Sequence, residues 1–308
     1  MEIISIVIKS GIYNATPILL VALGETIVEK SGILNLGLEG LMLFGALIGF
    51  IFSYLTNSVF IGFLLAFVLT GLFNLIHGII TITLKANQTV SGLALTFLGV
   101  GVSSFLGRGF VGKTAPHLKI ITIPFLSKIP FIGNILFNQN IVVYLSFILI
   151  FALYFFIYKT RGGLYLQICG ENPATADTAG INVDFNRYLA IFVGGCFAGI
   201  GGAFITLGEA ATWVDNISNG KGWIAVAIVI FGRWNPIKVA FTSYLFGTLY
   251  ILPLRLQVYG ISIPSNILGM IPYIFTIIVL IITSIGTIKK RLGAPAALGL
   301  PYNRELKD

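Results

Sequence analysis

Acidic and amide side chains interrupt the long apolar sequence most clearly between residues 19 and 50. Two apolar runs there enclose Glu25, Asn35 and Glu39. A charge at membrane depth costs about 2.5–3.5 kcal/mol on insertion scales, so such residues normally face a cavity or a partner group. The helix breakers at 31–37 would expose backbone groups to the same cavity. The pattern therefore predicts that Glu25, Asn35 and Glu39 line a pathway for a polar solute or bond neighbouring helices.

A second polar group follows the apolar run that ends near position 208. Glu209, Trp213 and Asp215 put two carboxylates beside a flat aromatic ring. This combination suits a polar ligand that has a flat face and hydroxyl groups. Trp213 also fits an aromatic belt at a membrane surface, so both interpretations stay open. Glu209 belongs to the predicted pathway residues.

Four further residues near these groups are assigned a role, two in a turn and two in the pathway. Glu29 and Lys30 fit a cytoplasmic turn after the first apolar run. Phe97 and Phe204 are predicted to line the pathway, although most of the 25 phenylalanines must face lipid or the core.

A polar segment at about 159–187 contains the signal for a short helix. Asn172 is a capping residue, Pro173 fits the first helical position, and Gly180 fits the stop. A helix of about two turns is unstable alone in water. Its small side chains would let the backbone of another protein approach closely, so we predict contact with a partner protein. The residues of this predicted contact are Glu171, Asn172, Pro173, Ala174, Thr175, Ala176, Asp177 and Gly180.

Residues 107–114 match the phosphate-binding pattern of Gly, four residues, Gly-Lys and then Ser or Thr. A working phosphate loop needs a buried strand before it and a helix that starts at the Lys-Thr pair. Here an apolar helix precedes the match and Pro116 follows it. The match therefore predicts a basic loop and no nucleotide site.

The elements that must position these residues are transmembrane helices. Of the 308 residues 56% are hydrophobic and 10% are charged, against about 25% charged in soluble domains, which excludes a water-soluble globule. A crossing takes about 20 residues, and the apolar runs are too continuous for a β-barrel. We predict an all-α polytopic transmembrane bundle of about eight to ten segments, with nine favoured. The expected spans are 10–28, 36–56, 59–84, 90–107, 140–158, 188–208, 237–256 and 266–286, with a half-helix or tilted segment at 222–232.

Basic residues predict the orientation of this bundle. With the tail at about 287–308 in the cytoplasm, nine segments place 12 of the 19 Lys and Arg residues inside, as the positive-inside rule expects. The N-terminus and a loop at about 108–139 are then outside, and the segment at about 159–187 is inside. This topology explains the formal net charge of +8, so we expect no nucleic-acid partner. Residues 1–308 are predicted to form one transmembrane domain.

An internal repeat is faintly visible. The sequence Leu-Gly-Glu occurs at 23–25 and again at 207–209, each time before glycines and a further apolar run. Inverted halves built around interrupted helices are common in transporters, although so short a match also arises by chance. The two cysteines and two histidines show no metal-site spacing. We expect no metal, no cofactor and no catalytic residue.

Three stretches make the chain resemble the permease subunits of bacterial ATP-binding-cassette (ABC) importers for simple sugars, branched-chain amino acids and nucleosides. They are 24–46, 170–183 and 222–236, and the resemblance covers nearly the whole chain. The tail at 294–305 is most similar to the second, shorter permease of nucleoside importers. The sequence FGRWNP at 231–236 departs from the glycine-rich turn that is typical of the sugar group.

The resemblance implies an inverted-repeat importer architecture and alternating access driven by a separate ATPase. It implies that 171–180 docks on an ABC ATPase subunit, that a second permease completes a heterodimer, and that an extracytoplasmic substrate-binding lipoprotein docks over 108–139 and 209–221. We predict a non-catalytic permease for nucleosides in the cell membrane. A simple-sugar permease of the ribose or galactose type is the alternative. A more distant alternative is an ion-coupled secondary transporter with Glu25 or Glu39 as a proton relay.

Overall fold

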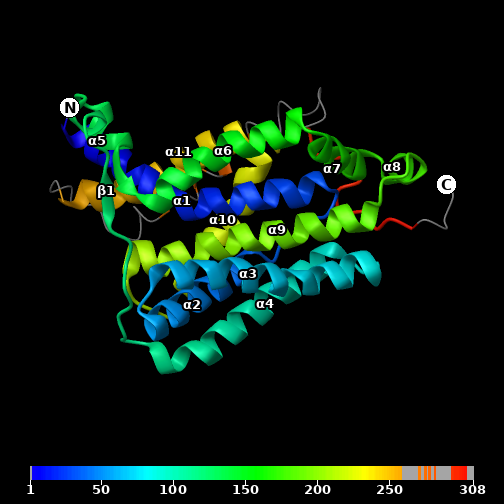
Figure 1. Cartoon of the computed structure of the whole chain (residues 1–308), viewed down its shortest axis with the longest axis horizontal. Coiled ribbons are helices and arrows are strands. Elements are labelled where there is room, and N and C mark those ends of the chain that lie inside the picture. Colours follow the sequence, from blue (N-terminus) through cyan, green and yellow to red (C-terminus); the bar gives the residue numbers. More distant parts are fainter. Residues whose placement is uncertain are drawn as a thin grey trace.

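The protein forms an elongated bundle of antiparallel helices (Figure 1). The computed structural model describes residues 2–258, 270–271, 274–275, 277–278, 281 and 293–303. Its main helices are α1 (Glu2–Lys30), α2 (Leu38–Thr56), α3 (Val59–Gly78), α4 (Gln88–Gly107), α6 (Ile141–Lys159), α7 (Arg161–Glu171), α8 (Pro173–Thr178), α9 (Val183–Phe204), α10 (Lys221–Phe231) and α11 (Pro236–Val258). The π-helical turns η1 (Ile79–Thr83) and η4 (Ile205–Ala210) extend α3 and α9.

Six helical stretches of the described chain are long and apolar enough to cross a membrane. They confirm six of the predicted spans, while α10 is a shorter apolar helix at the predicted half-helix and α11 occupies the predicted span at 237–256. The predicted span at 266–286 lies outside the described residues, apart from isolated positions. The six stretches are Ile4–Lys30, Leu38–Thr56, Val59–Thr83, Gln88–Phe110, Ile141–Lys159 and Val183–Ala210.

The long helices α1 and α9 pack against each other along the centre of the bundle. Glycines permit the close approach: a Cβ on Gly24 would lie 2.9 Å from the carbonyl oxygen of Gly194, and one on Gly201 would lie 2.7 Å from that of Pro17. These contacts run in opposite directions along the two helices, so α1 and α9 are antiparallel.

Both central helices are followed by an irregular segment and then by a helix that starts again within the bundle. After α1 comes 31–37 and then α2, and after η4 comes 211–220 and then α10, which has 11 residues. The two Leu-Gly-Glu sequences each precede one of these interruptions. Two antiparallel central helices that are each followed by an interruption agree with the inverted halves that the faint sequence repeat suggested.

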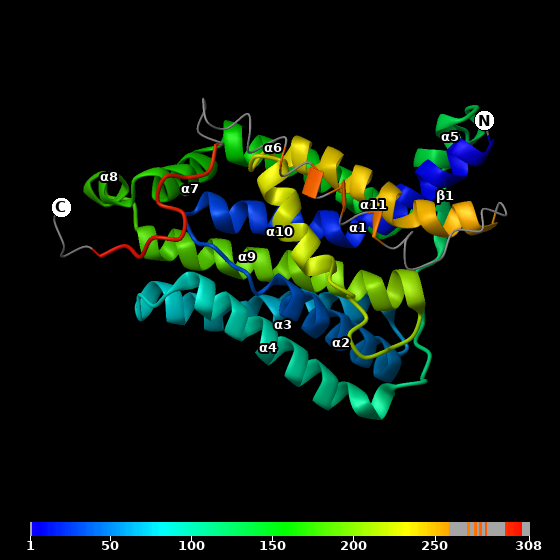
Figure 2. The ribbon, with the colours of Figure 1, turned by 180° about the vertical axis from the view of Figure 1, so that it is seen from behind.

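The bundle has two different ends (Figure 2). The end that we call the N-terminal end carries the start of α1, a small antiparallel sheet of β1 (Ile120–Thr122) and β2 (Asn138–Asn140), and α5 (Ile132–Leu136). The 3₁₀ turns η2 (Arg108–Phe110) and η3 (Leu126–Lys128) belong to the same connection. Residues 211–212 join this end through a backbone bond from Ala115 N–H to Ala211 C=O and a bridge to Thr114.

The opposite end, which we call the tail end, carries α7, α8 and residues 293–303. The start of α1 and residues 293–303 therefore lie at opposite ends of the bundle. The structure adds detail to two predicted segments. The connection at 108–139 contains strands and short helices, and the segment at 159–187 contains the helix α7 before the short one.

The residues that match a phosphate-binding pattern follow the prediction. Residues 107–114 leave the end of α4 through the turn η2, with no strand before them and no helix starting at Lys113. The Lys113 ammonium lies over the rings of Tyr54 and Phe110, 5.1 and 4.8 Å from their centroids. The match is a basic loop that packs on α2.

Candidate translocation and coupling sites

Glu25 and Asn35 meet at the first interruption of the bundle. The Glu25 carboxylate accepts a hydrogen bond of 3.2 Å from the backbone N–H of Asn35. The Asn35 side chain donates to Asn74 Oδ1 on α3 at 3.0 Å and accepts from Gly37 N–H at 2.8 Å. Glu25, Asn35 and Asn74 are all buried. Side chains from α1 and α3 thus replace the hydrogen bonds that the broken helix loses, as buried backbone groups require.

Further side chains bond the backbone of the first interruption, and the sequence did not single them out. Leu34 N–H donates to Gln88 Oε1 at 2.7 Å, and Leu34 C=O lies 3.2 Å from His77 Nε2. Thr96 on α4 donates to Leu36 C=O at 3.0 Å. Asn74 and His77 could have been found, because they place two polar side chains one turn apart in an otherwise apolar run.

Glu39, which directly follows the first interruption, forms hydrogen bonds with residues at the end of the second interruption. Its carboxylate accepts hydrogen bonds from the Ser218 hydroxyl and from the backbone N–H groups of Gly220 and Gly222, the last two at 2.9 and 2.7 Å. These N–H groups belong to the N-terminus of α10, where the helix dipole favours a negative charge. Glu39 therefore caps α10 from α2, inside the bundle.

Glu29 and Lys30 end α1 directly before the turn at 31–32. Both are buried, and Glu29 accepts a hydrogen bond from the indole N–H of Trp234, which follows α10. The reason is that 31–37 folds back into the bundle, so the end of α1 is covered by later parts of the chain. Trp234 could not be recognised as a partner from spacing, because 205 residues separate it from Glu29.

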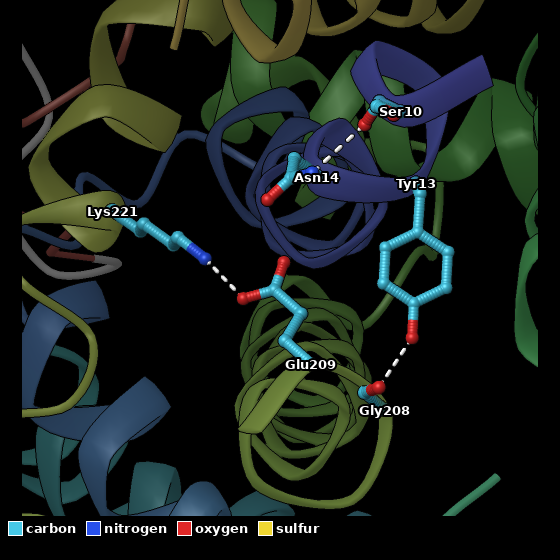
Figure 3. Close-up of polar contacts among 6 residues, drawn as sticks. All are labelled: Ser10, Tyr13, Asn14, Gly208, Glu209 and Lys221. Carbon is cyan, nitrogen blue, oxygen red and sulfur yellow. Dashed lines mark hydrogen bonds and ion pairs between the residues drawn. The ribbon is translucent and has the colours of Figure 1, made fainter. Parts of the chain in front are cut away.

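Glu209 pairs with Lys221 across the second interruption (Figure 3). The Lys221 ammonium lies 2.5 Å from Glu209 Oε2, and both side chains are largely shielded from solvent. Glu209 Oε1 is buried and has no hydrogen-bond partner. Figure 3 shows the carboxylate directed from η4 toward α1, where Tyr13 donates to Gly208 C=O and Asn14 donates to Ser10 C=O.

The two aromatic candidates, Phe204 and Phe97, lie in different surroundings. Phe204 is fully buried and lies against the Tyr13 ring, with the two centroids 5.2 Å apart. Phe97 is 74% exposed on the outer face of α4, because neighbouring Leu95 and Thr96 occupy the face toward α2. The structure therefore does not bring Phe97 to the other candidates.

Trp213 and Asp215 do not form the ligand-facing pair that their spacing suggested. Trp213 is buried, and its indole packs against the backbone at Gly107. Asp215 accepts a hydrogen bond of 2.6 Å from the Ser104 hydroxyl. Both residues fasten 211–220 to the end of α4, so their role is in packing. Lys221, which the sequence reasoning did not select, is the partner of Glu209 instead.

At the tail end, α8 forms as predicted. The Asn172 side chain accepts from Thr175 N–H at 3.0 Å, Pro173 is the first helical residue, and Gly180 has the left-handed φ of 78°. Most residues of the predicted contact are exposed, but Ala176 is fully buried against Cys169 and Val183. The small side chain at 176 therefore serves the packing of α8 on α7 and α9.

Residues 293–303 bind α7, the first interruption and the connection before α4 together. Ala297 N–H donates to Gly170 C=O at 2.9 Å, and Gly299 N–H donates to Gly32 C=O at 3.2 Å. The Lys85 ammonium donates to Asn303 Oδ1 at 2.8 Å.

The buried Arg187 on α9 adds to the same junction. Its guanidinium donates to Ser31 C=O at 3.2 Å and to Cys169 C=O at 3.4 Å. Burial raises the pKa of the Cys169 thiol, so this cysteine is a packing residue. Arg187 therefore links α7 to residue 31 at the start of the first interruption.

Several known proteins are similar to this chain in sequence over most of its length. A guanosine ABC transporter permease protein of Bacillus subtilis is 36% identical over 321 residues, covering 98% of each chain. A permease protein provisionally assigned to glucose ABC transport in Haloferax volcanii is 36% identical, covering 97% of this chain and 98% of its own. A nucleoside ABC transporter permease protein of Lactococcus lactis is 34% identical, covering 90% and 92%.

The family model described as the permease component of the branched-chain amino acid transport system matches residues 7–284. No solved structure matches the chain. The family match spans the two interrupted helices, the Glu209–Lys221 pair and the capped α8. The protein is therefore a multi-pass transport subunit that belongs to the ABC transporter permease family of the branched-chain amino acid type.

Proposed function

We propose that this chain forms the translocation pathway of an ATP-driven importer for nucleosides. The observation that carries the proposal is the match with a guanosine ABC transporter permease over 98% of both chains. The tail at 294–305 supports it, because this stretch resembles the shorter permease of nucleoside importers. Within its described part, Ala297 bonds Gly170 of α7 and Gly299 bonds Gly32. The chain itself would hydrolyse nothing, and ATP would be consumed by a separate subunit.

The pathway would run between the two interrupted helices. Glu25, Asn35, Glu39 and Glu209 lie at these interruptions, and Phe204 lies beside Tyr13 near the second one. Interrupted helices place solute sites near the centre of many transporters, because their free backbone groups line a cavity. Phe97 would join the pathway only where a second permease subunit covers the outer face of α4.

The exposed face of α8 would be the contact with the ATPase. Glu171, Ala174, Thr175 and Gly180 are exposed there, and none has a bulky apolar side chain. An ATPase works only in the cytoplasm, so the tail end and the C-terminus would be cytoplasmic. The N-terminal end, with 108–139 and 211–220, would then receive an extracytoplasmic substrate-binding lipoprotein.

The test is uptake into proteoliposomes that contain the chain with a second permease, the ATPase and the binding lipoprotein. We expect uptake of radiolabelled guanosine that requires ATP on the ATPase side and stops in a hydrolysis-deficient ATPase. ATP-driven uptake of glucose in place of guanosine would favour the sugar permease, which the match with the Haloferax protein supports as second candidate.

A further inference from the structure

A cavity of about 420 Å³ opens at the N-terminal end of the bundle. One wall is α1, with Lys9, Tyr13 and Asn14, and the opposite wall is β2 with the residues before it, including Asn134 and Asn138. Pockets for small organic ligands measure about 300–1,000 Å³. The cavity therefore has room for a nucleoside-sized solute.

The walls offer neutral hydrogen-bonding groups. They stand beside the apolar side chains of Ile6, Ile120 and Ile251, and they are asparagine and glutamine amides and the hydroxyls of α1. No described lining residue is a carboxylate, and Lys9 is the one cation among them. The Lys9 ammonium already donates to Asn134 Oδ1 at 3.3 Å. An amino acid zwitterion would need a carboxylate for its ammonium group, and a phosphate would need more cations or backbone donors. This lining fits a neutral solute that carries hydroxyl or amide groups.

Two residues of the cavity wall, Tyr13 and Asn14, lie beside the Glu209 side chain (Figure 3). Tyr13 and Asn14 line the cavity, and Tyr13 also bonds the backbone next to Glu209. Glu209 Oε1 is buried without a partner. A buried acceptor without a donor is destabilising because it has lost its hydrogen bonds to water, and a solute hydroxyl would supply the missing donor. Lys221 occupies only the other oxygen, Oε2.

We propose that this cavity is the outer subsite of the pathway, where a neutral, hydroxylated solute binds through Asn14 and Asn138 before its hydroxyl passes to Glu209. The inference rests on the proposed function, which makes the solute a nucleoside. It adds the place where the solute first binds in the membrane subunit and excludes charged analogues from that place.

Protection of a cysteine tests occupancy without measuring transport. Asn134→Cys puts a thiol on the exposed rim of the cavity, while the native Cys169 and Cys196 are both buried. In the assembled complex, a maleimide reagent should label this thiol. Guanosine at about ten times its dissociation constant should slow the labelling about tenfold, because only the free fraction reacts. Val111→Cys, exposed on the same connection and outside the cavity, should be labelled at one rate with and without guanosine.

A second pair of substitutions tests whether the Asn14 side chain is needed to bind guanosine in the cavity. Asn14→Leu in the Asn134→Cys background should abolish protection. Thr16→Val is its matched control, because Thr16 also donates to a carbonyl four residues earlier in α1 but does not line the cavity. Protection should survive in that variant.

The outcomes separate the two levels of the proposal. Unchanged labelling in a complex that imports guanosine would overturn the subsite and leave the function standing. Protection by glucose in place of guanosine would keep the subsite and overturn the nucleoside assignment. Protection by leucine or by guanosine monophosphate would overturn the neutral-solute inference.

Discussion

Glu39 on α2 accepts a hydrogen bond of 2.7 Å from the backbone N–H of Gly222 on α10, across 183 residues of sequence. This bond joins the helices that restart after the two interruptions. The same carboxylate binds Gly220 N–H and the Ser218 hydroxyl, so one side chain satisfies three donors of the second interruption. The two inverted halves are therefore linked at their irregular segments as well as through α1 and α9.

Removal of the Glu39 carboxylate should destabilise this link. Glu39→Ala leaves three donors without their acceptor, and hydrogen bonds to a charged group are worth about 1.5–3 kcal/mol each. We expect a clear fall in the thermal unfolding midpoint of the purified protein in detergent. Glu39→Gln keeps one carbonyl acceptor, so its unfolding midpoint should fall less. Equal midpoints for wild type and Glu39→Ala would contradict the capping role.

Gly222 should tolerate no side chain. A Cβ there would lie 2.4 Å from both the backbone nitrogen and the Cα of Glu39, so the two helices would have to separate. Gly222→Ala should therefore lower the yield of folded protein in the membrane, as judged by size-exclusion chromatography. Gly101→Ala is the control, because a Cβ on Gly101 of α4 meets nothing within 4 Å. It should be neutral or add up to about 1 kcal/mol of helix stability.

The Glu209–Lys221 pair should behave as a buried ion pair. Lys221→Met alone leaves the Glu209 charge without its partner, and breaking such a pair costs about 3–5 kcal/mol. The double variant Glu209→Gln with Lys221→Met should recover much of that stability, measured as unfolding midpoints in a double-mutant cycle. It should not recover guanosine uptake if Glu209 contacts the solute. Additive losses in the cycle would show that the two groups do not interact.

Two alanines of the α8 region should respond differently to tryptophan. Ala174 is exposed and Ala176 is fully buried. Ala174→Trp should leave the protein folded and weaken ATPase docking about tenfold, equal to about 1.4 kcal/mol, measured by co-purification. Ala176→Trp should displace α8 and lower thermal stability first. Normal docking in a folded Ala174→Trp complex would move the proposed ATPase contact elsewhere.

Local chemistry made part of the fold predictable. The apolar runs predicted the spans, the breakers at 31–37 predicted the interruption, and Asn172 with Pro173 predicted the start of α8. Each of these features depends on neighbours in sequence, since caps and breakers act within a few residues.

Long-range partners were not predictable in the same way. Trp234 binds Glu29 and Lys221 binds Glu209 because the chain folds back at two interruptions. A single sequence contains no signal for such returns. Trp213 was misjudged for the same reason: its ring matches a membrane belt or a ligand site equally well until the position of Gly107 is known.

ATP-driven guanosine uptake by the reconstituted complex is the decisive measurement. We expect uptake that needs this chain, the binding lipoprotein and a hydrolysing ATPase, and Glu209→Gln should reduce it. Guanosine uptake by this chain alone, driven by a proton gradient with no ATPase present, would contradict this expectation.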